Sequence, residues 1–303
     1  MSLLTNWLES LSYDLEFSES CTRKISPLSS CSACFDACPD EAILLENETM
    51  MIDEKRCTSC GVCITACPVQ AIKGQSPSRK VIQGHLLLEQ ESPLPSLTEL
   101  LYYHKKGIRF IHQPSLNSKL VNRISQTNEV LGAMSLELLQ VTNQFVLEPE
   151  EQPRLSRRDF FAKISSDSRK TVLSSVTPVK WRFNESNFKP SFLFKDWSFY
   201  KVKINEDECT LCEACFNICP SGVFSLGENE LIMNENQCTG CHLCLDICRT
   251  SAITVEQKVH QAPSVSYNLS KNICKQCGTG FHAWEESDSC HICSTIEKPN
   301  FFL

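Results

Sequence analysis

The sequence CTLCEACFNICP, residues 209–220, spaces four cysteines at intervals of three, three and four positions. Close variants occur at 57–68 (CTSCGVCITACP) and 238–249 (CTGCHLCLDICR), and an incomplete copy occurs at 31–39 (CSACFDACP). Cysteines repeated at this spacing direct their sulfur atoms toward one centre, and thiolates are the ligands that soft metals and iron–sulfur clusters prefer. The stretch therefore predicts that metal or cluster binding organises these parts of the chain.

The chain of 303 residues contains 20 cysteines, which fall into three blocks. Two blocks of eight form an internal repeat, because Cys38 precedes Cys57 by 19 positions and Cys219 precedes Cys238 by the same 19. The N-terminal stretch lacks the basic region and small-residue cleavage site of a secretion signal. Disulfide bonds are therefore a poor explanation for these cysteines.

The repeated runs match the bacterial ferredoxin pattern C-x2-C-x2-C-x3-C-P over residues 21–75 and again over 205–257. The chain thus resembles the bacterial two-cluster ferredoxins twice. The resemblance implies a ββαβ-like fold with pseudo-twofold symmetry, two 4Fe–4S cubes in each module, and electron transfer as the activity. In that family three ligands come from one loop, and the cysteine before proline reaches the other cluster.

Carried over residue by residue, this crossover pattern implies four 4Fe–4S clusters. The implied ligands are Cys21, Cys31, Cys34 and Cys67 for cluster one; Cys57, Cys60, Cys63 and Cys38 for cluster two; Cys209, Cys212, Cys215 and Cys248 for cluster three; and Cys238, Cys241, Cys244 and Cys219 for cluster four.

Two positions depart from the family pattern. Leu28 stands where the first run should begin, and the nearest cysteine, Cys21, comes seven residues earlier. We expect Cys21 to be the displaced ligand, because the longer loop costs only about 1.3 kcal/mol of closure entropy. The alternative is a three-cysteine site that holds a 3Fe–4S cluster. Arg249 replaces the proline after Cys248, and its positive charge is expected to raise the potential of cluster three.

A third block near the C-terminus has the spacing C-x2-C-x12-C-x2-C and consists of Cys274, Cys277, Cys290 and Cys293. Two such knuckles form a tetrahedral S4 site, which is typical of a zinc ribbon. We predict one Zn2+ here, with a single iron as the less favoured ion. His282 and His291 are expected at the surface, since four cysteines already complete the ligand shell.

The region between the two repeats contains no cysteine and predicts a small α/β domain with parallel strands. Its first helix has a capping box formed by Ser96 and Glu99 and ends at Gly107. The predicted elements are strands at 81–89 and 108–112 and helices at 96–107 and 116–134.

The predicted fold class is α+β, with two bacterial ferredoxin-like modules, a small intervening α/β domain and a C-terminal zinc ribbon. The predicted boundaries are 1–78 for an N-terminal helix and ferredoxin module 1, 79–147 for the α/β domain, 148–156 for a linker, 157–262 for a basic lead-in and ferredoxin module 2, and 263–303 for the ribbon.

Several other classes of protein are disfavoured. No run of 18 apolar residues is present, so no transmembrane segment is predicted. A net charge of −7 and the lack of a basic–aromatic patch disfavour nucleic-acid binding. SRRDFF, at 156–161, resembles a twin-arginine export motif, but it is internal and precedes a polar stretch. We expect it to be non-functional and the protein to be cytoplasmic.

The function predicted from these features is electron transfer between redox protein partners, or within a larger oxidoreductase complex. No catalytic motif is present, so the chain is not expected to be an enzyme. Through its SRR segment and cysteines, the second half loosely resembles ferredoxin-type accessory proteins of periplasmic nitrate reductase. This resemblance motivates the first alternative, a maturation or assembly factor for a metalloenzyme, and the second alternative is an iron–sulfur redox sensor.

Overall fold

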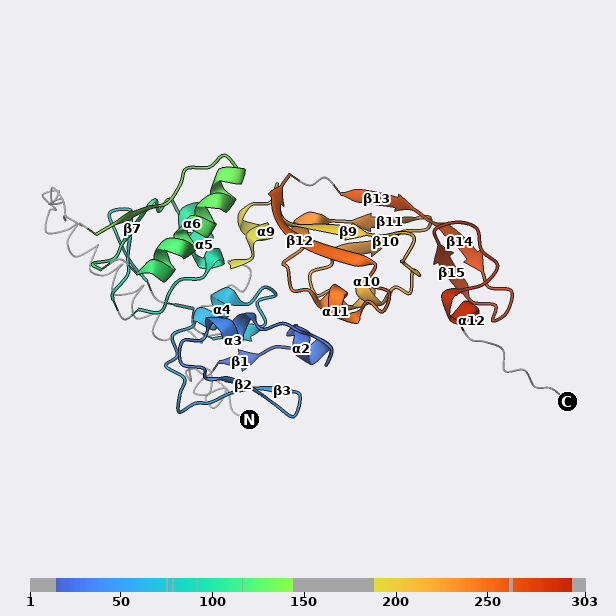
Figure 1. Cartoon of the computed structure of the whole chain (residues 1–303), viewed down its shortest axis with the longest axis horizontal. Helices are drawn as coiled ribbons and strands as arrows, with labels where there is room; N and C mark the ends of the chain where they lie inside the picture. Colours follow the sequence, from blue (N-terminus) through green and yellow to red (C-terminus); the bar gives the residue numbers. More distant parts are fainter. Residues whose placement is uncertain are drawn as a thin grey trace, which may run out of the picture. The chain divides into compact units, whose positions relative to one another are not determined.

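The computed structural model describes residues 15–74, 76–77, 79–90, 92–115, 117–143, 188–261 and 264–295. The chain forms two compact units, whose elements are labelled in Figure 1. The first takes in the described residues of Met1–Glu19, Ala33–Glu46 and Met50–Phe188, and the second those of Ser20–Ser32, Asn47–Thr49 and Lys189–Leu303. The predicted N-terminal helix and the predicted linker at 148–156 lie outside the described residues.

The first cysteine-rich module has the element order β, α, β, β, α, β. Strand β1 pairs antiparallel with β4, and β2 pairs with β3. Its elements are β1 (Glu16–Phe17), α3 (Ala33–Ala37), β2 (Ile43–Glu46), β3 (Thr49–Ile52), α4 (Val62–Ala66) and β4 (Ile72–Lys73). The module thus consists of two successive β-α-β halves, each built around one short helix, and this order differs from the ββαβ-like order that the resemblance implied.

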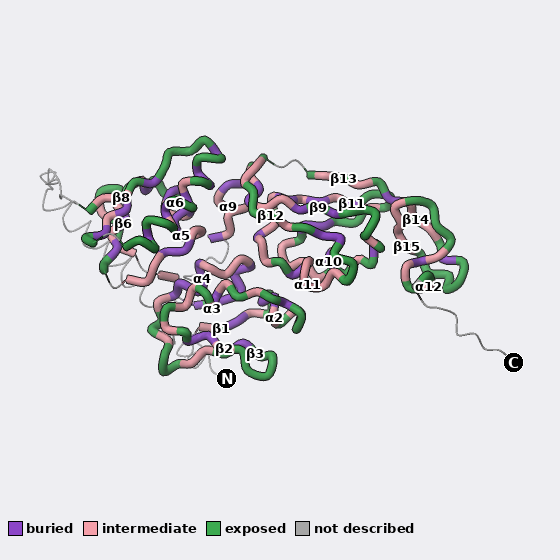
Figure 2. The backbone as a smooth tube through the Cα atoms, in the orientation of Figure 1, coloured by how far each residue is buried: buried purple, intermediate pink, exposed green. Residues whose placement is uncertain are grey.

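The α/β region of the first unit is a four-stranded sheet in the order β5-β6-β7-β8. Strands β6, β7 and β8 are parallel, as predicted, while β5 is antiparallel to β6. The elements are β5 (Lys80–Ile82), β6 (His85–Leu87), α5 (Leu97–Lys105), β7 (Phe110–His112), α6 (Ser118–Ala133) and β8 (Gln140–Thr142). Figure 2 shows where the buried residues of this region lie along the backbone, and its apolar core includes the fully buried side chains of Leu86, Leu100, Leu101, Ile111, Leu120 and Leu131.

One predicted element of this region is wrong. The stretch 81–89 was expected to form one strand, but β5 and β6 are separated by a tight turn. Gln83 and Gly84 form this turn with φ angles of 46° and 77°, a left-handed conformation that glycine adopts without steric cost. The apolar run HLLL after the turn conceals this break from a hydrophobicity pattern.

A buried polar network joins α5 to α4. Arg79 and Glu99 form an ion pair with side chains only 4% and 1% exposed, and Arg79 Nε donates to Glu99 Oε1 at 2.7 Å. Thr65 of α4 donates its hydroxyl to Glu99 Oε2 at 3.5 Å. Ser96, the N-cap of α5, donates its hydroxyl to the Thr65 carbonyl at 3.1 Å. The α/β region is therefore fixed to the helix that carries Cys63.

The second unit repeats the element order of the first module. Strand β9 pairs antiparallel with β12, and β10, β11 and β13 form a three-stranded sheet. Its elements are α9 (Pro190–Leu193), β9 (Ser198–Ile204), α10 (Ala214–Ile218), β10 (Phe224–Leu226), β11 (Glu230–Met233), the 3-10 helix η2 (Glu235–Gln237), α11 (Leu243–Ile247), β12 (Ile253–His260) and β13 (Val265–Asn268). Val202, Val223, Leu231 and Met233 lie at the centre of its core.

The inserted residues after Cys21 form a short helix, α2 (Thr22–Ile25), which belongs to the second unit. Cys21 and Thr22 are buried, and Ser29 donates its hydroxyl to Thr22 Oγ1 at 2.9 Å. Ser30 donates through its backbone N–H and its hydroxyl to the carboxylate of Asp246, at 2.8 Å each. The insertion is thus a folded segment rather than an extended loop.

The C-terminal part of the second unit is a β-hairpin followed by a short helix. Strand β14 (Ser270–Ile273) pairs antiparallel with β15 (Gly280–Ala283), and α12 (His291–Thr295) follows. The turn between the two strands includes Gly278, with a φ of 73°. Cys274 and Cys277 lie in this turn, so both are placed at the same end of the hairpin.

Candidate iron–sulfur and metal centres

The first unit contains a cavity lined by Cys38, Cys57, Cys60 and Cys63. These are the four cysteines assigned to cluster two. Burial, together with the neighbouring sulfurs of Cys60, Cys38 and Cys57, raises the pKa of the Cys63 thiol to about 12. A buried thiolate is disfavoured unless a cation compensates its charge, so the cavity suits a positively charged iron centre.

A corresponding cavity in the second unit is lined by Cys219, Cys238, Cys241 and Cys244, the cysteines assigned to cluster four. Burial raises the pKa of Cys238 to about 12 and that of Cys241 to about 11. Apolar side chains complete the wall of the cavity, including Val202, Val223, Phe224, Leu243 and Val255. An apolar wall excludes water, which is one of the factors that set the potential of an iron–sulfur cluster.

The cysteines assigned to cluster three also lie close together. Burial, together with the sulfurs of Cys209, Cys212 and Cys248, raises the pKa of Cys215 to about 12. Cys212 is exposed, whereas the other fifteen cysteines of the two repeats are buried or half-buried. The cluster three position is therefore the one with a ligand open to water.

Three of the cysteine loops share one backbone conformation. In each loop the third and fifth residues have a left-handed φ, between 49° and 73°, and these residues are Ser59, Gly61, Leu211, Glu213, Gly240 and His242. Successive N–H groups in turns of this kind converge on one point and bind anionic groups, including iron–sulfur clusters. The conformation costs on the order of 1–3 kcal/mol for a residue other than glycine. Such strain is typical of a functional site.

The first cysteine run lacks this conformation. Ser30 and Ser32 occupy the corresponding positions, and no residue from 20 to 38 has a positive φ. Cys21 and Cys31 belong to the second unit, and Cys34 and Cys67 to the first. The ligand set of cluster one therefore stays a prediction from the sequence.

The four short helices explain how one run can serve two clusters. Each helix starts one residue before the third cysteine of its run and ends one residue before the fourth. The fourth cysteine then turns into an extended conformation, with ψ of 116° at Cys67, 111° at Cys219 and 107° at Cys248. The chain leaves the helix direction at that point, as a crossover ligand requires.

Backbone N–H groups stabilise several of these fourth cysteines. The N–H of Ala42 donates to Cys38 Sγ at 3.3 Å, and the N–H of Ala71 donates to Cys67 Sγ at 3.2 Å. At Cys248, burial acts to raise the pKa, but hydrogen bonds from Thr250 and from backbone N–H groups outweigh it and lower the pKa. Hydrogen bonds to the ligand sulfurs are among the factors that set the potential of a cluster.

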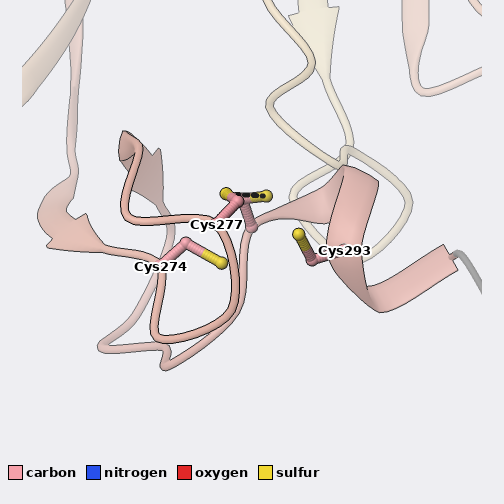
Figure 3. Close-up of side chains that lie close together, drawn as sticks. Cys274, Cys277 and Cys293 are labelled. Carbon is pink, nitrogen blue, oxygen red and sulfur yellow. Dashed lines mark hydrogen bonds between the residues drawn. The ribbon is translucent and has the colours of Figure 1, made fainter. Parts of the chain in front are cut away.

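The C-terminal cysteines form a separate and tighter site. The sulfur atoms of Cys274, Cys277, Cys290 and Cys293 all lie within 4.8 Å of one another. Figure 3 shows this group, with Cys274, Cys277 and Cys293 labelled. Two turns support it, since the N–H of Gly278 donates to the Cys274 carbonyl at 2.9 Å and the N–H of Ser294 to the Cys290 carbonyl at 3.0 Å.

Comparison with family models identifies the two repeats. Residues 29–71 and 208–253 each match a model described as a 4Fe-4S dicluster domain. The chain carries two 4Fe-4S dicluster domains. The predicted iron–sulfur, ferredoxin-type nature of the repeats is thereby confirmed, and it supports a role in electron transfer. The comparison with curated proteins finds no match to this chain.

The two matches cover the predicted ligands unequally. The second dicluster domain contains all eight cysteines from Cys209 to Cys248. The first begins at residue 29 and leaves Cys21 outside the match. Arg249 is exposed directly after Cys248, and its effect on the potential of cluster three stays a prediction.

Sequence reasoning missed two aromatic residues at the second dicluster domain. Tyr200 of β9 lies against Gly240, and burial raises the pKa of its phenol to about 12, with Cys238 and Cys241 adding to the shift. Trp284, which follows β15, donates its Nε1–H to the carbonyl of Cys209 at 2.8 Å. Both residues are distant from their cysteines in sequence, so no local motif predicts these contacts.

Two further expectations can be compared with the structure. The side chain of His282 was expected at the surface but is only 15% exposed, because its Nδ1 faces Glu213 Oε1 at 3.4 Å. Within the described ranges, no helix is long and apolar enough to cross a membrane.

Proposed function

We propose that this chain is an electron carrier, or the electron-transfer subunit of a larger complex, that holds four 4Fe–4S clusters. The observation that carries the proposal is the agreement between the dicluster matches and the geometry of the cysteines. The four cysteines assigned to cluster two and the four assigned to cluster four each line a cavity. In the set assigned to cluster three, the other three sulfurs lie close enough to Cys215 to raise its pKa. When bound, such clusters supply reversible one-electron chemistry.

The residues of the chain set the conditions for that chemistry. The left-handed loops at Gly61, Glu213 and His242 direct N–H groups toward the positions of clusters two, three and four, which favours the negative charge of each cluster. Buried apolar residues such as Ile43 and Val223 limit the access of water. We propose that electrons pass to and from redox protein partners and that the chain itself catalyses no further reaction.

For the C-terminal site, we propose a single metal ion rather than a cube. A metal bound about 2.3 Å from four tetrahedral sulfurs places them about 3.8 Å apart. The observed limit of 4.8 Å agrees with this spacing. In a cube the four sulfurs bind four different iron atoms at the corners, which sets them wider apart. Zn2+ is the ion that we propose, as the usual occupant of a structural site with four cysteines.

Metal analysis of anaerobically prepared protein tests the proposal. We expect about 16 iron and 16 sulfide per chain from four cubes, together with about one zinc. The iron should be redox-active in an anaerobic titration monitored by electron paramagnetic resonance. Protein that lacks redox-active iron would contradict the role as a carrier, whatever its zinc content.

A variant of the C-terminal site separates zinc from iron. We expect Cys277→Ser/Cys293→Ser to lose about one zinc and to keep about 16 iron. Loss of iron in place of zinc, with the absorption of a single ferric ion in the parent protein, would assign iron to the four-cysteine site.

A further inference from the structure

The hairpin of β14 and β15 is anchored to the second dicluster domain at its base. The N–H of Leu269, just before β14, donates to the carbonyl of Asn229 at 2.8 Å, and Leu269 is buried. Strand β13, which precedes it, pairs with β11 of the domain along four residues. The base of the hairpin is therefore continuous with the sheet of the dicluster domain.

Trp284 connects the same hairpin to the ligand loop of cluster three. Its Nε1–H donates to the carbonyl of Cys209, the first cysteine of that loop, at 2.8 Å. Its ring meets the ring of Tyr267 edge to face, with centroids 5.9 Å apart, and packs against the core of the unit. A hydrogen bond and a fixed ring thus hold the start of the loop.

His282 makes a second contact with the loop. Its Nδ1 lies 3.4 Å from Glu213 Oε1, and Glu213 stands between Cys212 and Cys215 with a left-handed φ of 61°. His282 lies in β15 and Trp284 directly follows it, and both side chains contact the segment 209–215. The hairpin therefore touches the loop at its first cysteine and again between its second and third.

The other end of the hairpin is the four-cysteine site. Cys274 directly follows β14, and its N–H donates to the carbonyl of Thr279, just before β15, at 3.0 Å. Each of the two strands has only four residues. An isolated hairpin of this length is marginally stable in water, so a metal ion bound to the cysteines at its end would hold the strands in place.

We propose that Trp284 and His282 are positioning residues for cluster three and that the metal ion of the four-cysteine site keeps them in position. The proposal rests on the proposed function in one respect, namely that the loop 209–215 holds an iron–sulfur cluster. It makes the two metal centres interdependent. Loss of the C-terminal ion releases the hairpin, removes the contacts at Cys209 and Glu213, and admits water to a cluster whose ligand Cys212 is already exposed.

Two measurable consequences follow for cluster three. Water reaches its iron more easily, so the iron is released faster to a chelator. Solvent also stabilises the more negative, reduced cluster, so the midpoint potential of cluster three rises. The hairpin contacts at Cys209 and Glu213 both reach the loop of cluster three, so the release rates and potentials of clusters one, two and four should stay unchanged.

The test uses the full-length protein, reconstituted anaerobically with iron, sulfide and zinc. The variants are Trp284→Phe, which keeps most of the ring but loses the N–H donor, Trp284→Ala, and Cys277→Ser/Cys293→Ser, which removes the metal ion. Trp197→Phe, elsewhere in the same unit, is the matched control for a tryptophan substitution. Iron release to a ferrous chelator and midpoint potentials by electron paramagnetic resonance are measured for each.

We expect about 4 of about 16 iron atoms to leave about tenfold faster in Trp284→Ala and in the metal-free variant, with a smaller acceleration in Trp284→Phe. One centre should shift to a higher potential in the same variants, and Trp197→Phe should match the parent protein. Unchanged rates and potentials in the metal-free variant would overturn the proposal. Equal loss from all clusters would also overturn it, because that result indicates general unfolding.

One further variant separates failure of this inference from failure of the proposed function. Cys212→Ala should lose about four iron atoms if its loop holds a cube, or about one if a 3Fe–4S cluster remains. If Cys212→Ala keeps the iron content of the parent protein, the loop holds no cluster, and both proposals are overturned. If it loses iron in either way while the hairpin variants behave as the parent protein, only the coupling is overturned.

Discussion

Gly240 occupies a sterically restricted position in the loop that carries Cys238 and Cys241. Its φ is 68°, and a Cβ atom at this position would collide with the ring of Tyr200. Gly240→Ala therefore combines a left-handed backbone with a clash against a buried side chain, at a cost of about 2 kcal/mol or more. We expect this variant to lose cluster four and to bind about 12 iron atoms instead of about 16.

A matched substitution separates the clash from the backbone strain. Gly84 has a φ of 77°, but a Cβ atom there meets nothing within 4 Å. Gly84→Ala should therefore keep the full iron content, although it adopts the same unfavourable backbone region. Equal iron content in the two variants would show that Tyr200 does not limit the loop.

At this scale the sequence predicts the sulfur ligands but little of what surrounds them. The spacing of Cys238, Cys241 and Cys244 is local and is fixed by the need to reach one centre. Tyr200 reaches the same site from a strand almost forty residues earlier, and only the pairing of β9 with β12 places it there. The left-handed conformations of Leu211 and Glu213 are also hidden, because neither residue type favours a positive φ.

Helix α10 lies between two cysteines that the crossover pattern assigns to different clusters. Cys215 is in its first turn, whereas Cys219 follows its last residue in an extended conformation. We expect Cys219→Ala/Cys241→Ala to remove one cube and leave about 12 iron atoms, because both ligands serve cluster four. Cys219→Ala/Cys215→Ala should remove two cubes and leave about eight.

The comparison is decided by iron analysis of the two double variants, each prepared anaerobically in parallel. Both contain two cysteine substitutions in the same unit, so they control for each other. If the result is reversed, with about 12 iron atoms in Cys219→Ala/Cys215→Ala and about eight in Cys219→Ala/Cys241→Ala, Cys219 belongs to the cluster of its own run and the crossover assignment is wrong.

Helix α5 depends on its buried ion pair with Arg79. Replacing one partner leaves the other charge buried and unpaired, which typically costs 3–5 kcal/mol. We expect Glu99→Leu to lower the melting temperature of the reconstituted protein, followed by circular dichroism at one scan rate. Arg79→Met/Glu99→Leu should recover most of the loss, because it removes both charges from a site where their side chains are 4% and 1% exposed. A double variant as unstable as the single one would show that packing, not charge, is decisive.

Among the elements, those with local end signals were predicted best. The helix predicted at 96–107 is observed as α5, and Ser96 accepts the N–H of Glu99 as its capping box requires. The helix predicted at 116–134 is observed as α6, Ser118–Ala133. The strand at 81–89 failed because a two-residue turn interrupts an apolar run. The buried Arg79–Glu99 pair was not predicted either, since Arg79 lies just before β5, 20 positions from Glu99, and no local pattern joins the two residues.

For the whole molecule, the number of cysteines is the strongest constraint from the sequence. Four cubes with four ligands each and one ion with four ligands use all 20 cysteines. The grouping of residues into units was not predictable in the same way. Residues 20–32 belong to the second unit although they lead into the first dicluster domain and include its first residues, because contacts such as that of Ser30 with Asp246 are with residues far along the chain.

Cys21 is assigned as a ligand mainly because four cubes and one ion require all 20 cysteines. It is buried at the start of α2, and it lies outside the matched dicluster domain. If it is the fourth ligand of cluster one, Cys21→Ser should either reduce the iron content from about 16 to about 12 or leave a 3Fe–4S cluster with about 15. A 3Fe–4S cluster is recognised by its resonance in the oxidised protein.

Leu28→Cys provides the matched variant, because it restores the cysteine at the position that the bacterial ferredoxin pattern requires. In the background of Cys21→Ser it should restore the fourth cube if the loop can adopt the usual conformation. The positions of Ser30 and Ser32 lack the left-handed φ of the other loops, so we expect this rescue to be incomplete. A full set of four unaltered cubes in Cys21→Ser alone would show that Cys21 is not a ligand and that the count of 20 cysteines includes one without a cofactor.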